Sequence, residues 1–403
     1  NGAIWLDYDR DGLLDLYVTA YFRSDVDLWK VRTTRIMHDS FEYARNGGKN
    51  LLFHNLGNGR FEDVTDKMGV GSTRWTLAAA SADFNEDGWP DLYVANDYGP
   101  EELYLNDHGK GFTLARVGLE ADSKSGMSAT LGDVHNRGRL DAFVTNISEK
   151  GYLVQGNNLR LNLLKELGKF ENIGSGPVVD AGWAWGAQFG DLNNDGTNDL
   201  FIANGFISSN PKKNYWYGMS KVAGANRNLF EDAKSWPPIG DASLSGYERA
   251  RVLLNRGDAG WEDVSQRVGV TETFDGRAVA MADLFNDGAV DVIVANQNAR
   301  PAVYRNTVTP GNHWIEFKLV GAVSNRSAIG AEVVVEFGGR SQRRVVDGGM
   351  GFAAQNDRRL HFGIGQRLAV DKVTIHWPSG GVQVLGRLDG DRLHVITEPG
   401  KPR

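Results

Sequence analysis

The sequence contains no cysteine among its 403 residues. Disulfide bridges, thiolate metal sites and thiol nucleophiles are therefore excluded, while the redox compartment stays open. No stretch approaches the roughly 20 apolar residues that a membrane-spanning helix requires, so we expect no transmembrane segment. A basic excess is also missing. The net charge is −7, whereas a nucleic-acid-binding surface needs surplus lysine and arginine, so we expect no nucleic-acid partner.

Glycine, in contrast, is abundant, with 50 residues, and this favours many turns between short strands. The chain is too long for one ordinary hydrophobic core, so the length predicts two domains. No signal peptide is visible. Because the sequence begins at Asn1 and runs at once into a strand pattern, we expect a processed or incomplete N-terminus.

An aspartate-rich segment of nine residues recurs five times, each time followed by an apolar run typical of a strand. We number these segments aspartate loops 1 to 5, and the positions within each from 1 to 9. They span residues 7–15, 83–91, 133–141, 191–199 and 283–291. Loops 1, 2 and 4 share the pattern Asp-x-Asx-x-Asp-Gly-x-x-Asp, whereas loops 3 and 5 are weaker copies.

A second element lies between the loops and reads as strand, glycine turn, strand, which is typical of a β-hairpin. It occurs at residues 51–65, 103–112 and 252–265. One repeat therefore holds about four short strands. Four-stranded units in series are typical of propeller blades, so we predict an all-β fold with a β-propeller over residues 1–308.

The loops have the composition of calcium sites. Calcium takes six to eight oxygen ligands, and a loop can supply carboxylate or amide oxygens at positions 1, 3, 5 and 9 with a backbone carbonyl at position 7. A strand follows where an EF-hand would need a helix, and no glutamate stands at position 12. The predicted ligands are Asp7, Asp9, Asp11, Leu13, Asp15, Asp83, Asn85, Asp87, Trp89, Asp91, Asp191, Asn193, Asp195, Thr197 and Asp199.

Loops 3 and 5 depart from the pattern. In loop 3, Arg137 occupies position 5, where its guanidinium can replace an ion by pairing with Asp133 and Asp141, so we expect no metal there. In loop 5, Phe285 removes the ligand at position 3. Asp283, Asp287 and Asp291 remain. The sequence therefore predicts about three Ca²⁺ ions of structural role and leaves a fourth open.

Two segments interrupt the repeats, at residues 24–48 and 206–250. Insertions of this kind gather on one face of a propeller, often the binding face. The second is rich in aromatic residues, which suits recognition, although packing against the blades explains them equally well. The aromatic residues are Phe206, Tyr215, Trp216, Tyr217, Trp236 and Tyr247.

Residues 309–403 lack the repeat. Period-two alternation, as in residues 313–320 and 331–337, predicts an antiparallel sheet or small sandwich. Polar residues cluster in its connections, at 324–326, 355–359 and 378–381. These clusters can form a binding edge, but their polarity favours solvent exposure.

Taken together, these residues resemble the ASPIC/UnbV family, with its propeller of FG-GAP or VCBS repeats. The aspartate loops match the repeat. The C-terminal domain of the family is matched by Gly311-Asn-His-Trp314, Ser324-Asn-Arg326 with Ile329-Gly-Ala331, Gln355-Asn-Asp357 with Leu360-His-Phe-Gly363, and Trp377-Pro-Ser-Gly380. The resemblance implies an exported, calcium-binding β-propeller, seven-bladed in related proteins, with adhesion or scaffolding roles. Since about five repeats are countable, we expect earlier blades to be absent from this sequence.

Two functional hypotheses follow. The first is a secreted or periplasmic binding module that contacts a protein or glycan partner, with a place in a larger complex left open. The second is an enzyme, or an accessory protein of a biosynthetic pathway, acting at the propeller face. No nucleophile elbow, zinc motif or Ser/His/Asp arrangement is recognisable, so binding is favoured and no catalytic residue is predicted. A buried carboxyl with a raised pKa away from any loop would favour the enzyme.

Overall fold

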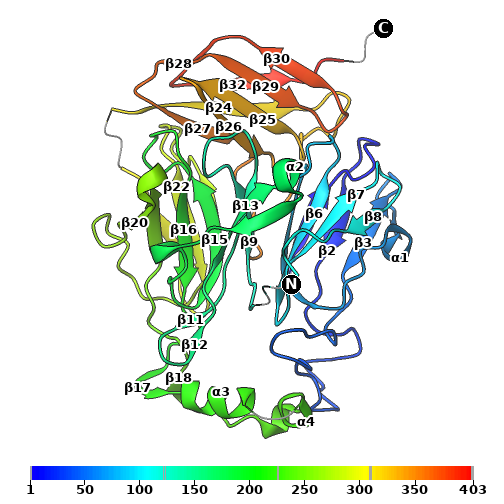
Figure 1. Cartoon of the computed structure of the whole chain (residues 1–403), viewed down its shortest axis with the longest axis vertical. Coiled ribbons are helices and arrows are strands. Elements are labelled where there is room, and N and C mark those ends of the chain that lie inside the picture. The colour runs from blue at the N-terminus through cyan, green and yellow to red at the C-terminus, as the bar shows by residue number, and fades with distance from the viewer. Residues whose placement is uncertain (1, 121, 123, 225–226, 308–310, 401–403) are drawn as a thin grey trace.

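The computed structural model describes residues 2–120, 122, 124–224, 227–307 and 311–400, and strands dominate it (Figure 1). Five small sheets follow one another along the chain, and a further domain of strands lies above them in Figure 1. This confirms the predicted all-β fold. Within the described residues, no helix combines the length and apolar character needed to cross a membrane.

The five sheets are the predicted repeats, and we call them blades 1 to 5. Blade 1 contains β1 (Ala3–Leu6), β2 (Asp15–Val18), β3 (Leu51–Asn55) and β4 (Phe61–Asp63). Blade 2 contains β5 (Trp75–Ala82), β6 (Asp91–Asp97), β7 (Glu102–Asn106) and β8 (Phe112–Leu114). Blade 3 contains β9 (Ala129–Gly132), β10 (Asp141–Val144), β13 (Asn158–Leu163) and β14 (Lys169–Asn172).

The last two blades differ in strand number. Blade 4 contains β15 (Ala184–Gly190), β16 (Asp199–Asn204), β19 (Arg251–Asn255) and β20 (Trp261–Asp263). Blade 5 contains β21 (Gly276–Ala282), β22 (Asp291–Asn296) and β23 (Ala302–Tyr304). All neighbouring strands within the blades are antiparallel. Blade 5 has three strands among the described residues.

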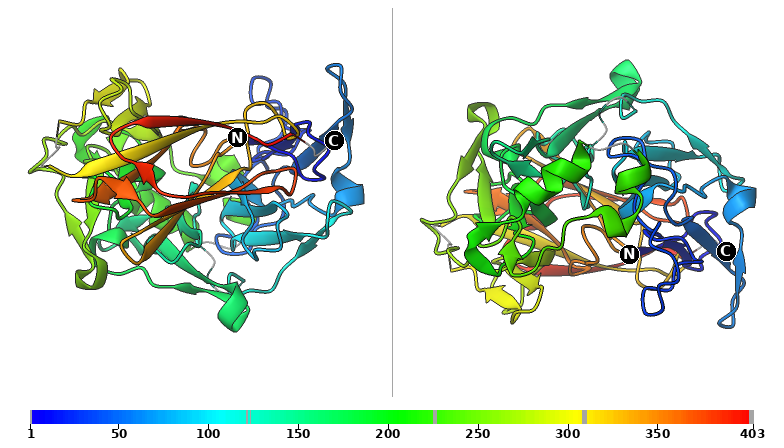
Figure 2. Two further views of the ribbon diagram at one scale, coloured as in Figure 1. Left: turned by 90° about the horizontal axis from the view of Figure 1, so that it is seen from above. Right: turned by 90° about the horizontal axis from the view of Figure 1, so that it is seen from below.

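The blades pack face to face, with their first strands side by side around a common axis (Figure 2). One apolar cluster lies between blades 1 and 2 and includes Leu6, Tyr17 and Leu92, all buried. Small residues allow the inner strands to approach closely. A Cβ on Gly186 of β15 would lie 2.3 Å from the carbonyl oxygen of Arg277 on β21, so only glycine fits there.

One asparagine per blade joins it to the preceding blade. The five clasp asparagines, as we call them, lie within two residues of the end of the third strand of each blade: Asn55, Asn106, Asn162, Asn255 and Asn306. In blades 2 to 5 the side-chain Nδ2 donates to the carbonyl oxygen at loop position 2 of the preceding blade, at 2.8–2.9 Å. The acceptors are Tyr8, Phe84, Val134 and Leu192.

The C-terminal domain is a β-sandwich, as the alternation predicted. One sheet contains β27 (Leu360–Gly365), β24 (His313–Val320) and β32 (Leu393–Thr397), with β24 and β32 parallel. The other contains β26 (Arg340–Val345), β25 (Glu332–Phe337), β29 (Lys372–His376) and β30 (Val382–Leu385). A short pair, β28 (Ala369–Val370) and β31 (Leu388–Asp389), flanks them. The predicted boundary between residues 308 and 309 lies outside the described residues.

A connection of the sandwich enters the propeller axis, and we call residues 347–359 the axial segment. Its backbone bonds to inner strands of three blades: Trp5 N to Gly348 O at 2.9 Å, Gly351 N to Ala129 O at 2.6 Å, and Asp357 N to Met281 O at 3.0 Å. The expectation that the polar cluster 355–359 faces solvent holds for Gln355 and Arg358, which are exposed, whereas Asn356, Asp357 and Arg359 are half-buried. Asn356 and Asp357 bond to Met281 on the inner strand β21.

The cluster at 324–326 is mostly buried, contrary to expectation. Ser324 and Asn325 are buried, and the backbone N–H groups of residues 322–324 all donate to the carboxylate of Glu398. Ser379 donates to that carboxylate at 2.6 Å. The carboxylate of Glu398, which is distant in the sequence, thus bonds to two of the polar connections.

The two insertions meet on the face opposite the C-terminal domain (Figures 1 and 2). Met37 N donates to Glu231 O at 3.2 Å, and Ala233 N donates to Thr34 O at 2.8 Å. This confirms that the insertions share one face. The second insertion holds β17 (Asn210–Asn214), α3 (Trp216–Ala223), α4 (Arg227–Phe230) and β18 (Ala242–Ser243), and the pair β11 (Ser148–Glu149) and β12 (Leu153–Val154) lies nearby in Figure 1.

Both expectations for the aromatic residues of the second insertion hold in part. Phe206, Tyr215 and Trp216 pack in a cluster with Trp183 of the propeller, which fits the packing role. Tyr217 and Tyr247 remain 65% and 45% exposed. Helices α1 (Thr65–Met68) and α2 (Leu164–Leu167) and the single turns at Gly176–Val178, Ala233–Ser235 and Gly257–Ala259 complete the described elements.

Candidate metal sites at the domain interface

All five aspartate loops have one backbone conformation, whatever their side chains. The glycine at position 6 has a positive φ between 74° and 91° in every loop, a conformation that glycine adopts without a steric penalty. Position 4 also has a positive φ, between 53° and 60°, although none of its residues is glycine. The residues at position 4 are Arg10, Glu86, Asn136, Asn194 and Asn286.

The aspartate at position 1 holds the turn. One of its oxygens accepts from the backbone N–H of the position-6 glycine, at 2.6–3.1 Å in all five loops. In loops 2 to 5 the other oxygen accepts from the N–H at position 5, at 2.9–3.1 Å. In loop 1 the second oxygen, Asp7 Oδ1, is buried without a hydrogen-bond partner among the described residues.

The aspartate at position 9 connects three parts of its blade. One carboxylate oxygen accepts from the N–H at position 2, at 3.0–3.2 Å. The other accepts from the N–H of the clasp asparagine, at 2.7–2.9 Å. A carboxylate offers about four lone-pair positions, so these two bonds still leave room for an ion. The residues are Asp15, Asp91, Asp141, Asp199 and Asp291.

Loop 1 brings its predicted ligands together. Asp7, Asp9 and Asp15 each offer a carboxylate oxygen within 4.8 Å of the others, and a second group within the same distance consists of carboxylate oxygens of Asp9 and Asp11 and a ring nitrogen of His54. Asp9 Oδ1, like Asp7 Oδ1, is buried without a hydrogen-bond partner among the described residues. Unpaired buried carboxylate oxygens are costly unless a cation compensates them, so this donor set fits Ca²⁺.

Loops 2 and 4 resemble each other in detail. The amide at position 3 donates to the position-5 carboxylate at 2.9 Å, from Asn85 to Asp87 and from Asn193 to Asp195. The amide oxygen accepts from the N–H at position 5, at 3.0 Å in both loops. Positions 1, 3 and 5 therefore converge in both loops, as the ligand pattern predicts.

Burial shifts the acid–base behaviour of these carboxyls. It raises the pKa of Asp7 to about 7, with Asp11 and Asp15 adding like-charge repulsion. Burial likewise raises the pKa of Asp83 to about 7, together with the charge of Glu332, and that of Asp191 to about 7, together with Asp195. Clustered carboxyls with such raised pKa values are in an unfavourable state when ionised without a counter-charge.

Loop 3 carries an internal cation. Arg137 Nη2 donates to Asp141 Oδ1 at 2.8 Å, which confirms the predicted pair, while Asp133 is reached by the Arg137 backbone N–H at 2.9 Å. Loop 5 has a cation that the sequence reasoning missed. Arg305 Nη2 lies 3.4 Å from Asp287 Oδ2, and its guanidinium stacks 4.0 Å from the Phe285 ring centroid.

Loop 1 has a comparable neighbour in His54. Its Nδ1 lies 3.1 Å from Asp15 Oδ1 and 3.5 Å from Asp9 Oδ2. Both His54 and Arg305 directly precede a clasp asparagine, where the hairpin reaches over the loop. The hairpin strand ends at a fixed place in each repeat, but only the packing of the hairpin over the loop brings this residue to the loop carboxylates.

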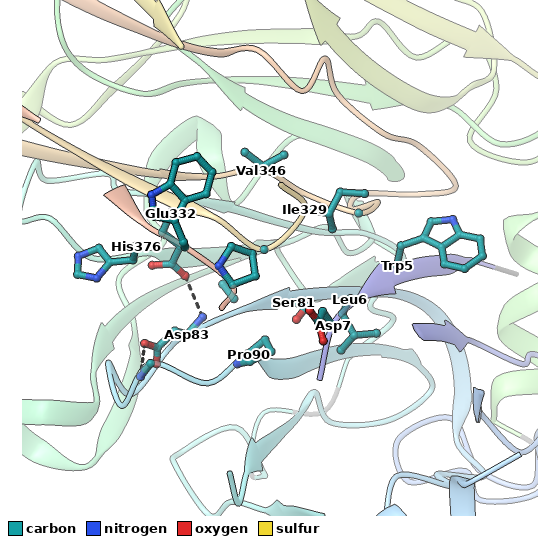
Figure 3. Close-up of a pocket in the computed structure, with 16 residues that line it drawn as sticks. Trp5, Leu6, Asp7, Ser81, Asp83, Pro90, Ile329, Glu332, Val346 and His376 are labelled. Atoms are coloured by element: carbon teal, nitrogen blue, oxygen red, sulfur yellow. Dashed lines mark hydrogen bonds between the residues drawn. The ribbon is translucent and has the colours of Figure 1, made fainter. Parts of the chain in front are cut away.

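The C-terminal domain docks on all five loops. At loop 2, Asp83 N donates to Glu332 Oε1 at 2.9 Å (Figure 3). At loop 3, Gly138 N donates to Ser341 O at 2.8 Å, and at loop 4, Gly365 N donates to Asn194 O at 2.9 Å. The fixed loop conformation therefore serves as a docking platform.

Loops 5 and 1 complete this platform. Arg359 donates to Asp283 O and Asn286 Oδ1, both at 2.6 Å. At loop 1, a Cβ on Gly12 would lie 3.0 Å from Val323 O. A small cavity of ≈ 50 Å³ separates loops 1 and 2 from the sandwich, and Figure 3 shows Asp7 and Asp83 at its propeller side, with Ile329 and Glu332 across from them.

Some buried carboxyls outside the loops also have raised pKa values. Burial raises the pKa of Asp97, Glu248, Glu316 and Asp347 to about 7 each. Asp97 accepts from Tyr21 Oη at 2.7 Å. Glu316 and Asp347 line a cavity of ≈ 70 Å³, far below the roughly 300–1,000 Å³ of small-molecule pockets. All four carboxyls meet the pKa criterion for an enzyme, and the cavity beside Glu316 and Asp347 lacks room for a substrate.

Family models match both parts of the chain. The "ASPIC and UnbV" model matches residues 321–403, and the "FG-GAP-like repeat" model matches residues 43–94 and 83–144. Residues 321–403 thus carry an ASPIC/UnbV domain, and residues 43–144 carry FG-GAP-like repeats. The family resemblance of the sequence is confirmed.

Among curated proteins, the chain is similar to cartilage acidic protein 1. It is 30% identical to the protein of Mus musculus over 171 residues and 31% identical to that of Homo sapiens over 175 residues. Each alignment covers 41% of this chain but spans only 26% of the relative. Among solved structures, the V. cholerae biofilm matrix protein Bap1 matches with a TM-score of 0.35 and 11% identity, over 96% of this chain and 60% of that one.

Proposed function

We propose that this protein is a calcium-stabilised binding or scaffold protein that acts outside the cytoplasm, in the extracellular space or periplasm, on a protein or glycan partner. The observation that carries the proposal is the donor set of loops 1, 2 and 4. Three copies of one turn gather hard oxygen ligands, and in loop 1 two buried oxygens lack any partner among the described residues. Oxygen-only sites of this kind suit calcium.

The similarity to cartilage acidic protein 1 supports a role outside the cytoplasm, as does the repeat type. The insertion face supports partner binding. Trp29 is 95% exposed, and Tyr217 and Tyr43 are also largely exposed on these insertions. Exposed aromatic side chains are enriched among residues that dominate binding energy.

Metal analysis tests the calcium part. The protein is treated with a chelator, exchanged into calcium and freed of excess ion, and we expect about three ions per chain. Asp87→Ala removes the position-5 ligand of loop 2 and should lower the count by one. Asp107→Ala, in the exposed hairpin turn of the same blade, is the matched control and should keep all ions.

Thermal unfolding gives a second readout. Ions that bind only the folded state stabilise it by mass action, so chelation should lower the melting temperature by several degrees. An unchanged melting temperature together with no bound calcium would refute the proposal. Binding to glycan and secreted-protein arrays, compared between the wild type and a Trp29→Ser, Tyr217→Ser variant, tests the partner face.

A further inference from the structure

The first insertion contains a tight turn with two large apolar residues at its corners. Lys30 N donates to Asp27 O at 3.1 Å, and Trp29 N donates to Asp27 Oδ1 at 2.9 Å. An aspartate at the first position favours such a turn, whereas small or polar residues are the usual choice for the central positions. Here the central positions hold Leu28 and Trp29, so the turn presents apolar side chains where polar ones are expected.

These side chains remain in water. Trp29 is 95% exposed, Leu28 is 51% exposed and Val31, directly after the turn, is 48% exposed. Apolar residues that are scattered singly over a surface are ordinary, but three of them within four consecutive residues form a contiguous patch. We call residues 27–32 the apolar tip. Contiguous exposed apolar surface of this kind marks a contact with another molecule or with a membrane.

Cationic side chains accompany the apolar tip. Residues 23–35 contain four lysines or arginines and two aspartates, although the whole chain has a net charge of −7. One aspartate holds the turn, and the other, Asp25, pairs with Arg23 at 3.0 Å. Lys30 and Arg32 are exposed, and neither forms an ion pair within the part of the chain that the structure describes. Their charges are therefore available to an anionic partner.

Helix α3 of the second insertion presents a further pair of aromatic and cationic side chains. Tyr217 is 65% exposed, and Lys221 Nζ lies 4.4 Å from the centroid of its ring. The two insertions bond to each other and together form the end of the molecule opposite the sandwich (Figures 1 and 2). Tryptophan, tyrosine and basic side chains are enriched where proteins meet the boundary between a membrane and water.

The chemistry of the apolar tip favours a lipid surface over a glycan. A glycan is held through its hydroxyl groups, which need hydrogen-bonding side chains around the aromatic ring. Leu28 and Val31, the neighbours of Trp29 in the tip, carry no such group. A bilayer accepts apolar side chains without a matching pocket, and its anionic headgroups match the unpaired cations.

We propose that this end of the molecule binds the surface of a bilayer that contains anionic lipids. The turn places Leu28 and Trp29 at the boundary between headgroups and acyl chains, and Lys30 and Arg32 lie against the lipid phosphates. Burial of apolar area and attraction to anionic headgroups both contribute to such binding. The inference goes beyond the proposed function, because a bilayer is neither a protein nor a glycan and the loop ions take no part in the contact.

The probe consists of vesicles made of equal parts of phosphatidylcholine and phosphatidylglycerol, added to the full chain at one fixed calcium concentration. The wild type should co-sediment with them saturably, and more weakly with pure phosphatidylcholine. Leu28→Ser combined with Trp29→Ser should weaken binding about ten-fold or more, because these side chains no longer leave water for the bilayer. Leu368→Ser, at a side chain 67% exposed on the sandwich, is the matched control and should bind as the wild type does.

Charge reversal tests the cations. Lys30→Glu combined with Arg32→Glu should weaken binding to the anionic vesicles about five-fold or more for each residue. Lys67→Glu combined with Lys110→Glu changes the net charge equally, at exposed lysines in helix α1 and in the outer hairpin of blade 2. This second pair is the control and should bind as the wild type does. Equal weakening by both pairs would mean that only net charge matters, and would overturn the assigned contact.

Lipids brominated in their acyl chains locate the bound surface, because they quench tryptophan only at close range. Of the 11 tryptophans in the chain, Trp29 is the one that the proposal places in the bilayer. Binding should therefore quench the fluorescence of the wild type, and most of this quenching should disappear in Trp29→Phe, which keeps an apolar ring in the turn. Quenching that persists in Trp29→Phe would show that another face binds the bilayer, and would overturn the proposal.

The outcomes separate this inference from the proposed function. It fails if the wild type does not bind the anionic vesicles, or if the Leu28→Ser, Trp29→Ser variant binds them equally well, whatever the calcium content of the protein. Binding that this variant keeps and that a chelator abolishes would show calcium bridging between the loops and the phosphates instead. A glycan or secreted protein that requires Trp29, with no vesicle binding, would overturn the inference and leave the proposed function intact.

Discussion

Asn106 shows how a single side chain connects two blades of the propeller. Its Nδ2 donates to Pro90 O within its own blade and to Tyr8 O of blade 1, at 3.0 and 2.9 Å. Asn55, the clasp asparagine of blade 1, donates from Nδ2 to Leu14 O at 2.9 Å. The described residues include no preceding blade for it to reach.

This difference gives a matched pair of variants. Asn106→Ala removes the two Nδ2 bonds and the bond that Oδ1 accepts from Gly109 N, and it should destabilise the protein by about 2–3 kcal/mol. Asn55→Ala removes one Nδ2 bond and the bond that Oδ1 accepts from Gly57 N, so it should cost about 1 kcal/mol less, because no bond between blades is lost. Urea unfolding at constant calcium measures both. Equal losses would show that the contact between blades contributes nothing.

The burial of His38 should make the stability of the protein depend on pH. It is fully buried, its ring stacks 3.7 Å from the Tyr98 ring centroid, and burial lowers its pKa to about 4. In the unfolded chain a histidine has a pKa near 6.5. The unfolded state therefore binds the proton first as pH falls, so stability from neutral His38 is present above pH 6.5 and is lost progressively toward pH 4.

The comparison of wild type with His38→Phe isolates this effect. The stability of the wild type relative to the variant should fall by about 3 kcal/mol between pH 7 and pH 4. Buried carboxyls such as Asp97 titrate in both proteins and cancel in the difference. His108→Phe, at a side chain 59% exposed, is the control. A pH-independent difference for His38→Phe would contradict the prediction.

At the scale of the element, the nine-residue loop has the same backbone conformation whether or not an arginine side chain lies beside its carboxylates. Loop 3 uses Arg137 against the fully buried Asp141, and loop 5 has Arg305 near the exposed Asp287. The sequence predicted the first pair because Arg137 stands inside the motif. It did not reveal the second, because Arg305 comes from a different strand and approaches only through hairpin packing.

We expect substitution of these two arginines to lower the stability of the protein by unequal amounts. Arg137→Met leaves the buried Asp141 carboxylate without its partner and should destabilise the protein by about 3 kcal/mol. Arg305→Met breaks an exposed contact and should cost less than about 1 kcal/mol. Thermal and urea unfolding measure both variants, and a larger loss for Arg305→Met would reverse the assignment.

At the scale of the whole molecule, the five loops form the surface on which the C-terminal sandwich rests. Ions that fix the loops should therefore also fix the docking of that domain. We expect chelation to raise hydrogen exchange at Gly351 N and Asp357 N, which bond to inner strands. Amides of the β25–β29 ladder, inside the sandwich, are the control and should stay protected.

Two other results would contradict this coupling. Unchanged exchange in the axial segment would show that docking is independent of the loops. A uniform increase over both domains would show global destabilisation instead. The experiment uses the complete chain, so the domain interface is measured in place.

The sequence by itself determined the repeats, the all-β class, the positive φ at the loop glycines and the pair Arg137–Asp141, because each depends on residues close together in the chain. Only the tertiary structure decided what the loops support. The clasp between blades, Arg305 beside loop 5 and Glu332 on Asp83 join residues that are tens to hundreds of positions apart, and local periodicity contains no information about such contacts. The polar connection at residues 324–326 was misjudged for the same reason. Its backbone groups bond to Glu398, which is distant in the sequence, and only the fold brings that carboxylate within bonding distance.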